Sequence, residues 1–566
     1  MFRERSPQGS LLQSEFLVPP AKARRLERSW AEVFHSQALP LIDEQRFAHL
    51  YCEDNGRPNR AVQTVLGVLI LKDLYNLTDQ EALEQLEFNL LWHHALRLTA
   101  EEAHLAQKTL HNFRVRLIAH DGGRLAFVET TDGILAVLGI RTGKQRLDST
   151  HILSNMATLT RLGLFCETLR VFLRAVQRER PDLVSRMPEG VMRRYLKEDG
   201  EATAYEDARS GDGRRRLAVA ARDLYRLVAR FRGTGARKLA EYKLLRRLLQ
   251  EQCHVGKHGD GRPGDDDDDA GEGRVPVALK EPAEVAADSL QSPHDPDATY
   301  SGHKGKGYEV QVAETCDAEN ATQIITYVEV TPSSGSDAAV PVPLVEELAE
   351  REIQPEELFT DTTFGSGRNA FELARRGTEL VSPVAGTAPG KGQAPEPEGG
   401  GDPRLTAADF AIDATEVQRS RCPAGHPASE EWTYPHAPER VELSFTRATC
   451  EACPLRPRCP VKLDRRAGAY VLKANLIRVN IDQRRRTQVG EAWRQRYAVR
   501  AGIEGTNSEL KRGHGLGRLR VRGGLSVRLA VYLKALACNI KRMIGALQAQ
   551  ADQAVRAPIR GGAVAA

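Results

Sequence analysis

The segment from residue 307 to residue 382 alternates strand patterns with helix patterns, and this order restricts the fold of the 566-residue chain more than any other feature. Residues 307–313 alternate and residues 323–330 are β-branched and aromatic, which predicts two hairpin strands. The elements expected next are a helix from Ser336 to about Glu352, a strand at 357–361, a helix at 368–376 and a strand at 378–382. This order is typical of an α/β sheet with an antiparallel edge.

Aspartates stand in several strand-like or turn-like settings. Asp361 ends the strand at 357–361, and α/β sheets place their ligands at the carboxyl ends of strands, so Asp361 is the favoured site carboxylate. Asp148 lies in a short, partly β-favouring segment, Gln-Arg-Leu-Asp-Ser-Thr-His, where a lone acid carries little information. Asp295 and Asp297 are rival acids, but their proline-rich surroundings indicate a turn.

The stretch YAVRAGIEGTNSELK carries a polar stripe. Offsets of three, four and seven residues place one acid, two bases and a phenol on one face of an α-helix: Tyr497, Arg500, Glu504 and Lys511. A solvated helix face accounts for the spacing alone as well as a binding surface does. Gly502 and Gly505 each cost ~1 kcal/mol of helix propensity, which favours a bulky ligand that approaches the backbone closely.

The same stretch resembles the YREK pattern of DDE transposases from bacterial insertion sequences, which it fits without a gap. The resemblance implies that Glu504 is the third catalytic carboxylate and that Tyr497, Arg500 and Lys511 hold DNA backbone near the cut. In that family the first aspartate lies on the first strand of an RNase H-like sheet in a D-S-T or D-G-T setting, which Asp148 matches. The setting of Asp361 is similar to the D-x-G-[FY] block, although here the glycine follows the aromatic residue.

The resemblance covers nearly the whole chain and is closest to the insertion-sequence family eleven-eighty-two. It implies that Asp148, Asp361 and Glu504 converge and hold two Mg²⁺ or Mn²⁺ ions about 3.5–4 Å apart. The expected activity is cleavage at the ends of the element and strand transfer into double-stranded target DNA, by a homodimer or larger assembly formed on DNA. Two alternatives stay open: a catalytically inactive, transposase-derived DNA-binding regulator, and an RNase H-like nuclease that only hydrolyses DNA.

Residues 26–130 read as an all-α domain, preceded by a flexible arm at 1–25. Thr78 and Glu81 form a capping-box pattern, and Thr109 is the expected cap of a last, basic helix. The basic residues near the start of that helix predict that His111 and Arg114 contact DNA in the manner of a helix-turn-helix. Composition alone favours a plain bundle with solvated bases, whereas similarity to the N-terminal domain of many insertion-sequence transposases implies recognition of the element's ends.

Two glycine-punctuated basic loops are further candidates for contacts with DNA phosphates. The first offers His303, Lys304 and Lys306, and an ordinary solvated turn explains it equally well. The second follows the polar stripe and offers a longer set: Arg512, His514, Arg518, Arg520 and Arg522.

A cysteine cluster interrupts the core pattern between residues 383 and 480. Two further ligands beside a Cys-x-x-Cys pair can close a tetrahedral Zn²⁺ site. The preferred ligands are Cys422, Cys450, Cys453 and Cys459, with His426 as the substitute. Such a site would be structural, because four thiolates leave no open position; free thiols in a reducing cytosol are the alternative.

The expected fold is therefore an RNase H-like α/β core with a mixed sheet, interrupted by a helical insertion and a Cys-rich, zinc-ribbon-like insertion. The acidic run Asp265–Asp269 and the Gly- and Pro-rich stretch 386–403 predict loops that do not pack. The predicted boundaries are 131–152 for the first catalytic strand, 153–256 for the helical insertion, 257–298 for an acidic linker, 299–382 for the continued core, 383–480 for the Cys-rich insertion, 481–550 for the Glu helix, basic loop and last helix, and 551–566 for a disordered tail.

Charge and cysteine content narrow the setting. The chain has 80 basic and 76 acidic residues, so any nucleic-acid surface must come from local clustering. No run of 18 apolar residues occurs, which argues against a membrane protein. Nine cysteines, an odd number with four clustered, favour a reducing cytoplasm over a disulfide framework, and the expected location is the bacterial cytoplasm, at the nucleoid when DNA is bound.

Overall fold

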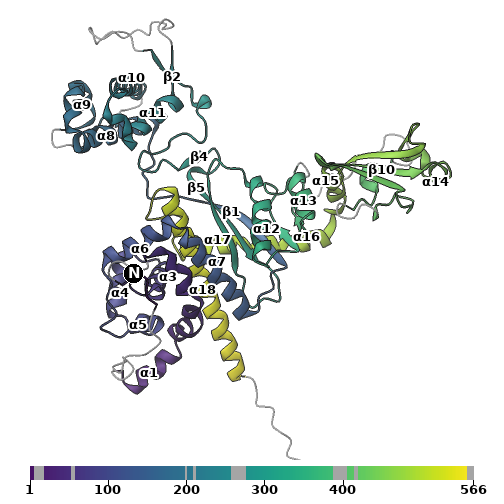
Figure 1. Cartoon of the computed structure of the whole chain (residues 1–566), viewed down its shortest axis with the longest axis horizontal. Helices are drawn as coiled ribbons and strands as arrows, with labels where there is room; N and C mark the ends of the chain where they lie inside the picture. Colours follow the sequence, from purple (N-terminus) through teal and green to yellow (C-terminus); the bar gives the residue numbers. More distant parts are fainter. Residues whose placement is uncertain are drawn as a thin grey trace, which may run out of the picture.

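The computed structural model describes residues 1–4, 18–52, 58–197, 201–207, 212–256, 276–385, 404–413 and 419–556. A central sheet is surrounded by N-terminal helices, a separate helical lobe and a small β-rich module (Figure 1). The predicted loops at Asp265–Asp269 and 386–403 lie outside the described residues.

The central sheet has six strands: β1 (Lys144–Ile152), β4 (Thr299–Ser301), β5 (Gly305–Thr315), β6 (Ile325–Pro332), β7 (Glu357–Phe359) and β8 (Glu379–Val381). Its order is β4-β5-β1-β7-β8, and β6 pairs with β5. The pairs β1–β5, β5–β6 and β4–β5 are antiparallel, whereas β1–β7 and β7–β8 are parallel. The predicted mixed sheet with an antiparallel edge is confirmed.

Alternate residues of β5 face two different hydrophobic layers, as the period of two in a strand requires. Ala313 packs with Leu344 of α12 (Pro341–Glu350) and Leu373 of α13 (Gly367–Ala374). Val312 belongs to the other layer, with residues of α18 (Gly524–Arg556) such as Leu536. The expected helix from Ser336 begins later, at Pro341, after a 3₁₀ turn at Asp337–Ala339.

The N-terminal helices form a bundle, part of which packs against the other side of α18 (Figure 1). They are α1 (Pro20–Glu27), α2 (Trp30–Val33), α3 (Val62–Leu74), α4 (Asp79–Phe88), α5 (Leu90–Leu96), α6 (Gln107–Ala119) and α7 (Gly122–Leu138). The Thr78 capping box at the start of α4 is confirmed. Thr109 lies inside α6, which begins at Gln107, so its predicted capping role is wrong.

The expected loose ends of the chain are partly helical. Helix α1 begins at Pro20, within the predicted flexible arm at 1–25, because proline fits the first turn of a helix. Helix α18 continues to Arg556, into the predicted disordered tail at 551–566, of which residues 557–566 lie outside the described part.

The segment between β1 and β4 forms a lobe with its own hydrophobic core. Its helices are α8 (Arg161–Glu179), α9 (Glu189–Tyr195), α10 (Gly213–Phe231) and α11 (Ala240–Gln252). Thr160 caps α8 by accepting a hydrogen bond from the backbone N–H of Gly163 at 3.0 Å. The rings of Phe172, Phe231 and Tyr242 pack together in the core, and a short hairpin of β2 (Cys253–Val255) and β3 (Val277–Leu279) closes the lobe.

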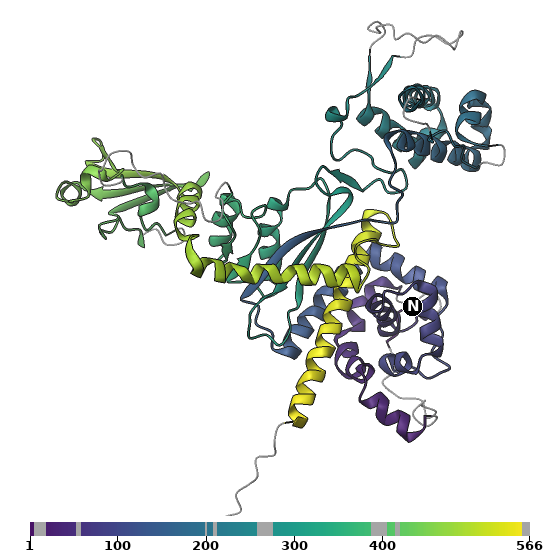
Figure 2. The ribbon, with the colours of Figure 1, turned by 180° about the vertical axis from the view of Figure 1, so that it is seen from behind.

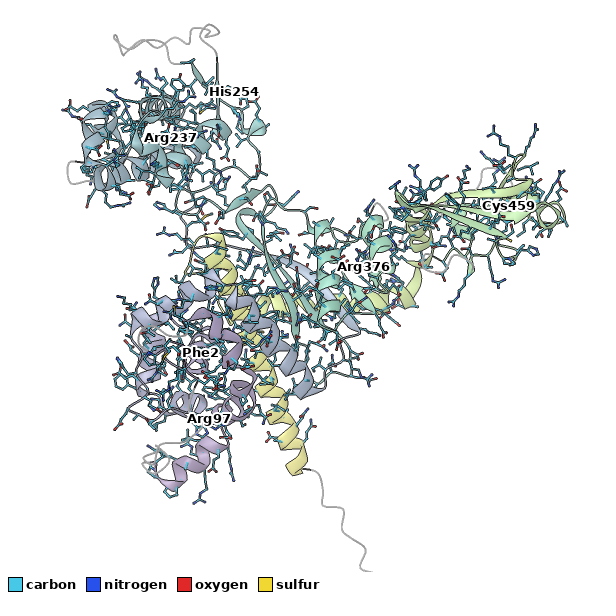
Figure 3. The ribbon with its side chains drawn as sticks, viewed as in Figure 1. Phe2, Arg97, Arg237, His254, Arg376 and Cys459 are labelled. Carbon is cyan, nitrogen blue, oxygen red and sulfur yellow. The ribbon has the colours of Figure 1, made fainter. Side chains whose placement is uncertain are left out.

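The Cys-rich segment folds as a four-stranded sheet in the order β11-β12-β10-β9. Its elements are β9 (Glu430–Tyr434), β10 (Ala437–Thr446), α14 (Arg447–Glu451), β11 (Lys462–Asp464) and β12 (Ala469–Asn475). Phe410, Leu443 and Phe445 lie in its separate core. Figure 3 shows Cys459 in this module, which projects from the central sheet.

A helical run leads from this module back to the centre of the molecule. It comprises α15 (Leu476–Thr487), α16 (Gly490–Ala498), a 3₁₀ turn at Val499–Gly502 and α17 (Ile503–Arg512). Seen from behind, the run passes along the sheet and reaches α18 (Figure 2). Among the described helices, none combines the length and apolar character that a bilayer crossing requires.

Candidate catalytic site

Strand β1 places Asp148 beside the helical run, where two side chains donate hydrogen bonds to it. Arg500 Nη2 lies 2.9 Å from Asp148 Oδ1, and Asn507 Nδ2 lies 3.2 Å from Asp148 Oδ2. Arg500 Nη1 is also 3.3 Å from Glu504 Oε1. One guanidinium therefore joins the first and third predicted carboxylates, which lie far apart in the sequence.

Asp361 follows β7, the parallel neighbour of β1, and the register that pairs Arg146 with Phe359 brings Asp361 beside Asp148, two residues further along each chain. Its Oδ1 accepts hydrogen bonds from the Thr363 backbone N–H at 2.8 Å and the Thr363 hydroxyl at 2.5 Å. These bonds hold the turn that leads into α13. The carboxylate stays near enough to Asp148 for its charge to raise the pKa of that residue.

The electrostatics of Asp148 are those of a crowded, mostly buried carboxylate. Its side chain is 13% exposed, and burial raises its pKa above the ordinary aspartate value. Asp361 adds to this effect and Arg500 opposes it. A divalent cation bound between these carboxylates would relieve the same repulsion, and carboxylate oxygens are the ligands that Mg²⁺ and Mn²⁺ prefer. Glu504, 69% exposed, stands at the open side.

The helical run supplies further contacts. The Tyr497 hydroxyl donates to the backbone carbonyl of Thr360 at 3.1 Å, next to Asp361, and its ring stacks on Trp493 with centroids 4.9 Å apart. The predicted single helix is interrupted by the 3₁₀ turn at Val499–Gly502.

The two glycines of the stripe have different explanations. A Cβ atom at Gly502 would lie 2.0 Å from Arg146 Nη1, so this glycine makes room for an arginine of β1. The expectation that a ligand explains Gly502 is therefore wrong. Gly505 faces open space, with nothing within 4 Å of an added Cβ among the described residues.

The basic residues beside the site differ in their hydrogen-bond partners and in their exposure. Lys304 Nζ lies 3.1 Å from the Ser149 hydroxyl and 2.6 Å from Glu309 Oε1. Burial lowers the pKa of Lys304, but the bond to Glu309 and the charges of the neighbouring carboxylates together raise it. Burial lowers the pKa of Lys511, and the charge of Asp148 opposes that effect. Lys306 is turned away and donates to the Leu159 carbonyl at 2.7 Å, while His303 is exposed.

The basic loop after α17 is mostly exposed, including Arg512, Arg518 and Arg522. Arg520 is exposed but donates to the backbone carbonyls of Asn76 and Leu77. His514 is fully buried, and its Nδ1 lies 3.1 Å from the Asp73 carbonyl oxygen. The predicted DNA contact of His514 is therefore wrong, because the ring fixes the loop to α3 instead.

The basic side of α6 meets this loop at a groove of about 660 Å³. His111, Arg114, Arg518 and Arg520 line it. Arg114 is also paired with Asp79 of α4, with Nη1 2.7 Å from Oδ1. The structure thus brings two separately predicted DNA-binding sets to one groove.

A buried ionic network behind the site was not predicted. The Glu314 side chain, 0% exposed, accepts hydrogen bonds from Arg146 Nε at 2.8 Å, Arg542 Nη1 at 2.9 Å and the Thr506 hydroxyl at 2.6 Å. It joins β1, β5, α17 and α18. No periodic pattern in the sequence marks these four residues. Asn507 is also absent from the predicted site, although it stands three residues after Glu504 and the spacing of a helix could have identified it.

The rival aspartates have other partners. Asp295 is buried and accepts a hydrogen bond from the Tyr308 hydroxyl at 2.5 Å. Asp297 accepts one from the backbone N–H of Gly524 at 2.8 Å, at the start of α18. Both contacts hold the chain together outside the carboxylate cluster.

The four clustered cysteines line one small cavity of about 20 Å³, together with His426. Burial raises the pKa of Cys450 to about 11, and the neighbouring cysteines add to the shift. Among the described residues, three potential metal ligands have atoms that all lie within 4.8 Å of one another: Glu509, His514 and Cys538. This group does not include the clustered cysteines. Both oxygens of Glu509 already accept hydrogen bonds, from Lys541 at 2.9 Å and Arg542 at 3.0 Å.

Comparison with known families identifies two segments. Residues 421–544, which contain Glu504 and the helices around it, match the model of a transposase DDE domain. Residues 27–116 match the model of a transposase domain, DUF772. No curated protein and no solved structure matches the chain. The two family matches support an insertion-sequence transposase with a DDE domain.

Proposed function

We propose that the chain is a DDE transposase that cuts DNA at the ends of its own insertion sequence and joins them to target DNA. Asp148, Asp361 and Glu504 are the proposed catalytic residues. The observation that carries the proposal is the bridge by Arg500 between Asp148 and Glu504, at the sheet edge where Asp361 also lies. The sheet order, antiparallel on one side of β1 and parallel on the other, supports an RNase H-like core.

The three carboxylates are the proposed ligands of two Mg²⁺ or Mn²⁺ ions, which would activate the attacking water in cleavage or the attacking 3′-hydroxyl in strand transfer, and would stabilise the leaving oxygen. The protein's own contribution is positive charge and position. Arg500 and Lys511 offer cations next to Asp148, where a scissile phosphate would gain negative charge. Tyr497 supports the turn that carries Asp361 through its bond to Thr360.

DNA binding is proposed for basic groups of the groove beside α6 and of the loop before β5. The groove between α6 and the loop after α17 offers His111, Arg114, Arg518 and Arg520, with Arg512 and Arg522 exposed nearby. Lys304, which lies 3.1 Å from the hydroxyl of Ser149 next to Asp148, and the exposed His303 are further proposed DNA contacts. Double-stranded DNA carrying the terminal repeats is the proposed partner, bound by a homodimer or larger assembly.

The finer assignments are proposals of the same kind. They include membership of the insertion-sequence family eleven-eighty-two and a cytoplasmic or nucleoid location. An all-α end-recognition domain and the two insertions are also proposed, and the arrangement of the elements fits them. A structural Zn²⁺ held by Cys422, Cys450, Cys453 and Cys459, or by His426 in place of one of them, is supported by the shared cavity of these side chains.

The test is Mg²⁺-dependent cleavage and strand transfer on DNA that carries the sequences flanking the gene. The wild type should cut and join, while Glu504→Gln should bind this DNA and do neither. Glu491→Gln is the matched control, because Glu491 is an exposed acid of α16 whose ion-pair partner is Arg494. Cutting without joining would indicate the nuclease, and binding without cutting by the wild type would indicate the regulator.

A further inference from the structure

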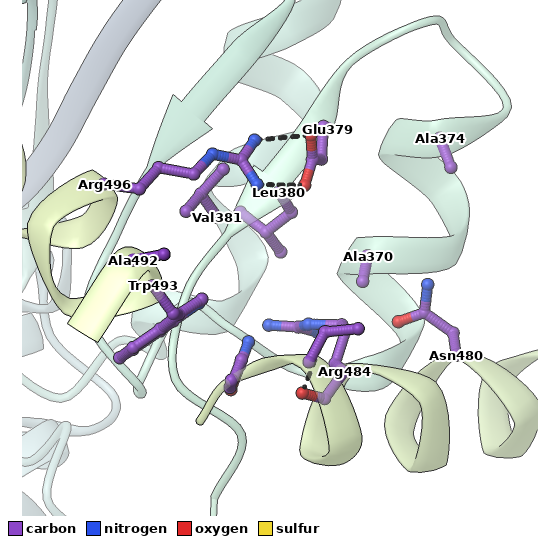
Figure 4. Close-up of a pocket in the computed structure, with 12 residues that line it drawn as sticks. Ala370, Ala374, Glu379, Leu380, Val381, Asn480, Arg484, Ala492, Trp493 and Arg496 are labelled. Carbon is purple, nitrogen blue, oxygen red and sulfur yellow. Dashed lines mark hydrogen bonds and ion pairs between the residues drawn. The ribbon is translucent and has the colours of Figure 1, made fainter. Parts of the chain in front are cut away.

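A cavity of about 340 Å³ lies between α13, β8, α15 and α16 (Figure 4). Its volume is within the usual range for small-ligand sites, roughly 300–1,000 Å³. The polar side chains that line it include Asn480, Arg484, Gln488 and Arg496, and Trp493 forms part of its wall. None of the three proposed catalytic carboxylates lines it.

Arg484 brings unsatisfied hydrogen-bond donors to this cavity. Its Nη2 donates to the Ser382 carbonyl at 2.6 Å. Its Nε and Nη1 are buried and have no hydrogen-bond partner among the described residues. Asn480, one helical turn earlier on α15, presents a buried Oδ1 that also lacks a partner there. Buried polar groups are almost always hydrogen-bonded, so both side chains indicate a missing partner.

Among the described residues, Arg484 has no ion-pair partner of its own. Burial lowers its pKa, and Glu379 is the carboxylate whose charge opposes this effect. Glu379, however, is already engaged by Arg496, with Nη1–Oε1 at 2.9 Å and Nη2–Oε2 at 2.6 Å, as Figure 4 shows. A buried guanidinium without its own counter-ion is costly, and an anion in the cavity would remove that cost.

The geometry selects the kind of anion. Both bidentate faces of a guanidinium include Nη2, which in Arg484 already donates to Ser382, so the free Nε and Nη1 point to different sides and need two separate acceptors. An anion with several phosphoryl oxygens, such as pyrophosphate, supplies acceptors on both sides together with the negative charge. A protonated oxygen or sugar hydroxyl of the same ligand would satisfy Asn480 Oδ1. The cavity volume leaves room for more than a single phosphoryl group.

We propose that this cavity is a binding site for a phosphoryl group, with Arg484 as its anchor. The group comes either from the backbone of a DNA strand or from a free phosphate. The site adjoins the candidate catalytic site, because Trp493 stacks on Tyr497, whose hydroxyl bonds to the residue before Asp361. It does not depend on the proposed catalysis, since binding there needs neither metal nor cleavage.

The test is thermal unfolding of the full chain in EDTA with added pyrophosphate, at an ionic strength matched with chloride. We expect the midpoint of the wild type to rise with pyrophosphate, and Arg484→Met to lose that rise because the loss of two charge-assisted bonds weakens binding at least about tenfold. Without pyrophosphate, Arg484→Met should be no less stable than the wild type, because it removes an unpaired buried charge. A merely structural arginine predicts the opposite: a lower midpoint in the absence of any anion.

Arg485→Met is the matched control, because Arg485 is the next residue of α15, pairs with Asp482 and does not line the cavity. It should keep the full response to pyrophosphate. A short DNA duplex tested on both variants identifies the source: weaker binding by Arg484→Met alone assigns the site to a DNA phosphate, and equal binding assigns it to a free phosphate. The proposal is overturned if pyrophosphate does not stabilise the wild type, or if Arg484→Met responds as the wild type does.

Discussion

Replacing Glu314 by glutamine tests whether the buried network holds α17 against the sheet. The change keeps the shape of the side chain and removes the one charge that Arg146 and Arg542 share. Breaking a buried ion pair costs about 3–5 kcal/mol. Arg542 keeps Glu509 at 3.0 Å and the Gln323 carbonyl at 2.9 Å, and Arg146 keeps the Val499 carbonyl at 2.7 Å. The expected cost is therefore the lower end, about 3 kcal/mol.

Amide hydrogen exchange of α17 measures this cost locally, which suits a chain with several separate cores. A cost of about 3 kcal/mol makes opening more frequent by a factor of roughly 100, and exchange of the α17 amides should accelerate accordingly. Glu319→Gln is the control, because Glu319 pairs with Arg141 at the surface, where ion pairs contribute little. Unchanged exchange of α17 in Glu314→Gln, or equal acceleration in the control, would refute the positioning role of the network.

Three further predictions concern the site and the Cys-rich module. Arg500→Gln should raise the pKa of Asp148, because Arg500 lowers it, so the acid limb of the cleavage rate should move to higher pH; an unmoved limb would mean that Asp148 does not control it. Burial raises the pKa of Asp148 in the folded chain, so its contribution to stability is complete below the unfolded pKa and is lost as pH rises through the folded pKa. Asp148→Asn should therefore unfold at a higher temperature than the wild type at neutral pH in EDTA, and a lower midpoint would contradict this reasoning. Cys453→Ser should lower the zinc content of the purified protein and speed proteolysis within residues 404–475, whereas Cys52→Ser, at an exposed cysteine outside the cluster, should do neither; equal zinc in both variants would count against the proposed site.

The sequence predicts the sheet well because its signals are local. The strands around Val312 and Val328 show β-branched, alternating patterns, and Asp361 could be placed at a strand end from its neighbours alone. Thr78 and Glu81 likewise mark the start of α4 through a pattern of four residues. Such features depend on neighbours in the chain, so they can be predicted without knowledge of tertiary contacts.

The features that the sequence did not predict correctly depend on contacts between distant segments. The sequence predicts that a ligand approaches Gly502, but the space beside this glycine is filled by Arg146 of β1. His514 stands in a basic, glycine-rich loop and yet is buried against α3, because the carbonyl of Asp73 accepts its hydrogen bond. Two nitrogens of Arg484 lack a partner among the described residues, and this can be recognised only in the folded structure, where three helices and a strand enclose them. Periodicity carries no information on any of these.

Helix α18, the last described helix, lies between the N-terminal helices and the central sheet, inside one hydrophobic core. Residues of α3 and α7 on one side and of β5 and β6 on the other pack with it in a single hydrophobic cluster. A gene copy with a stop codon before residue 524 would lack this helix, and both partners would expose apolar surface to water. We therefore expect such a truncated product to aggregate or be degraded, rather than persist as a DNA-binding competitor of the full-length protein.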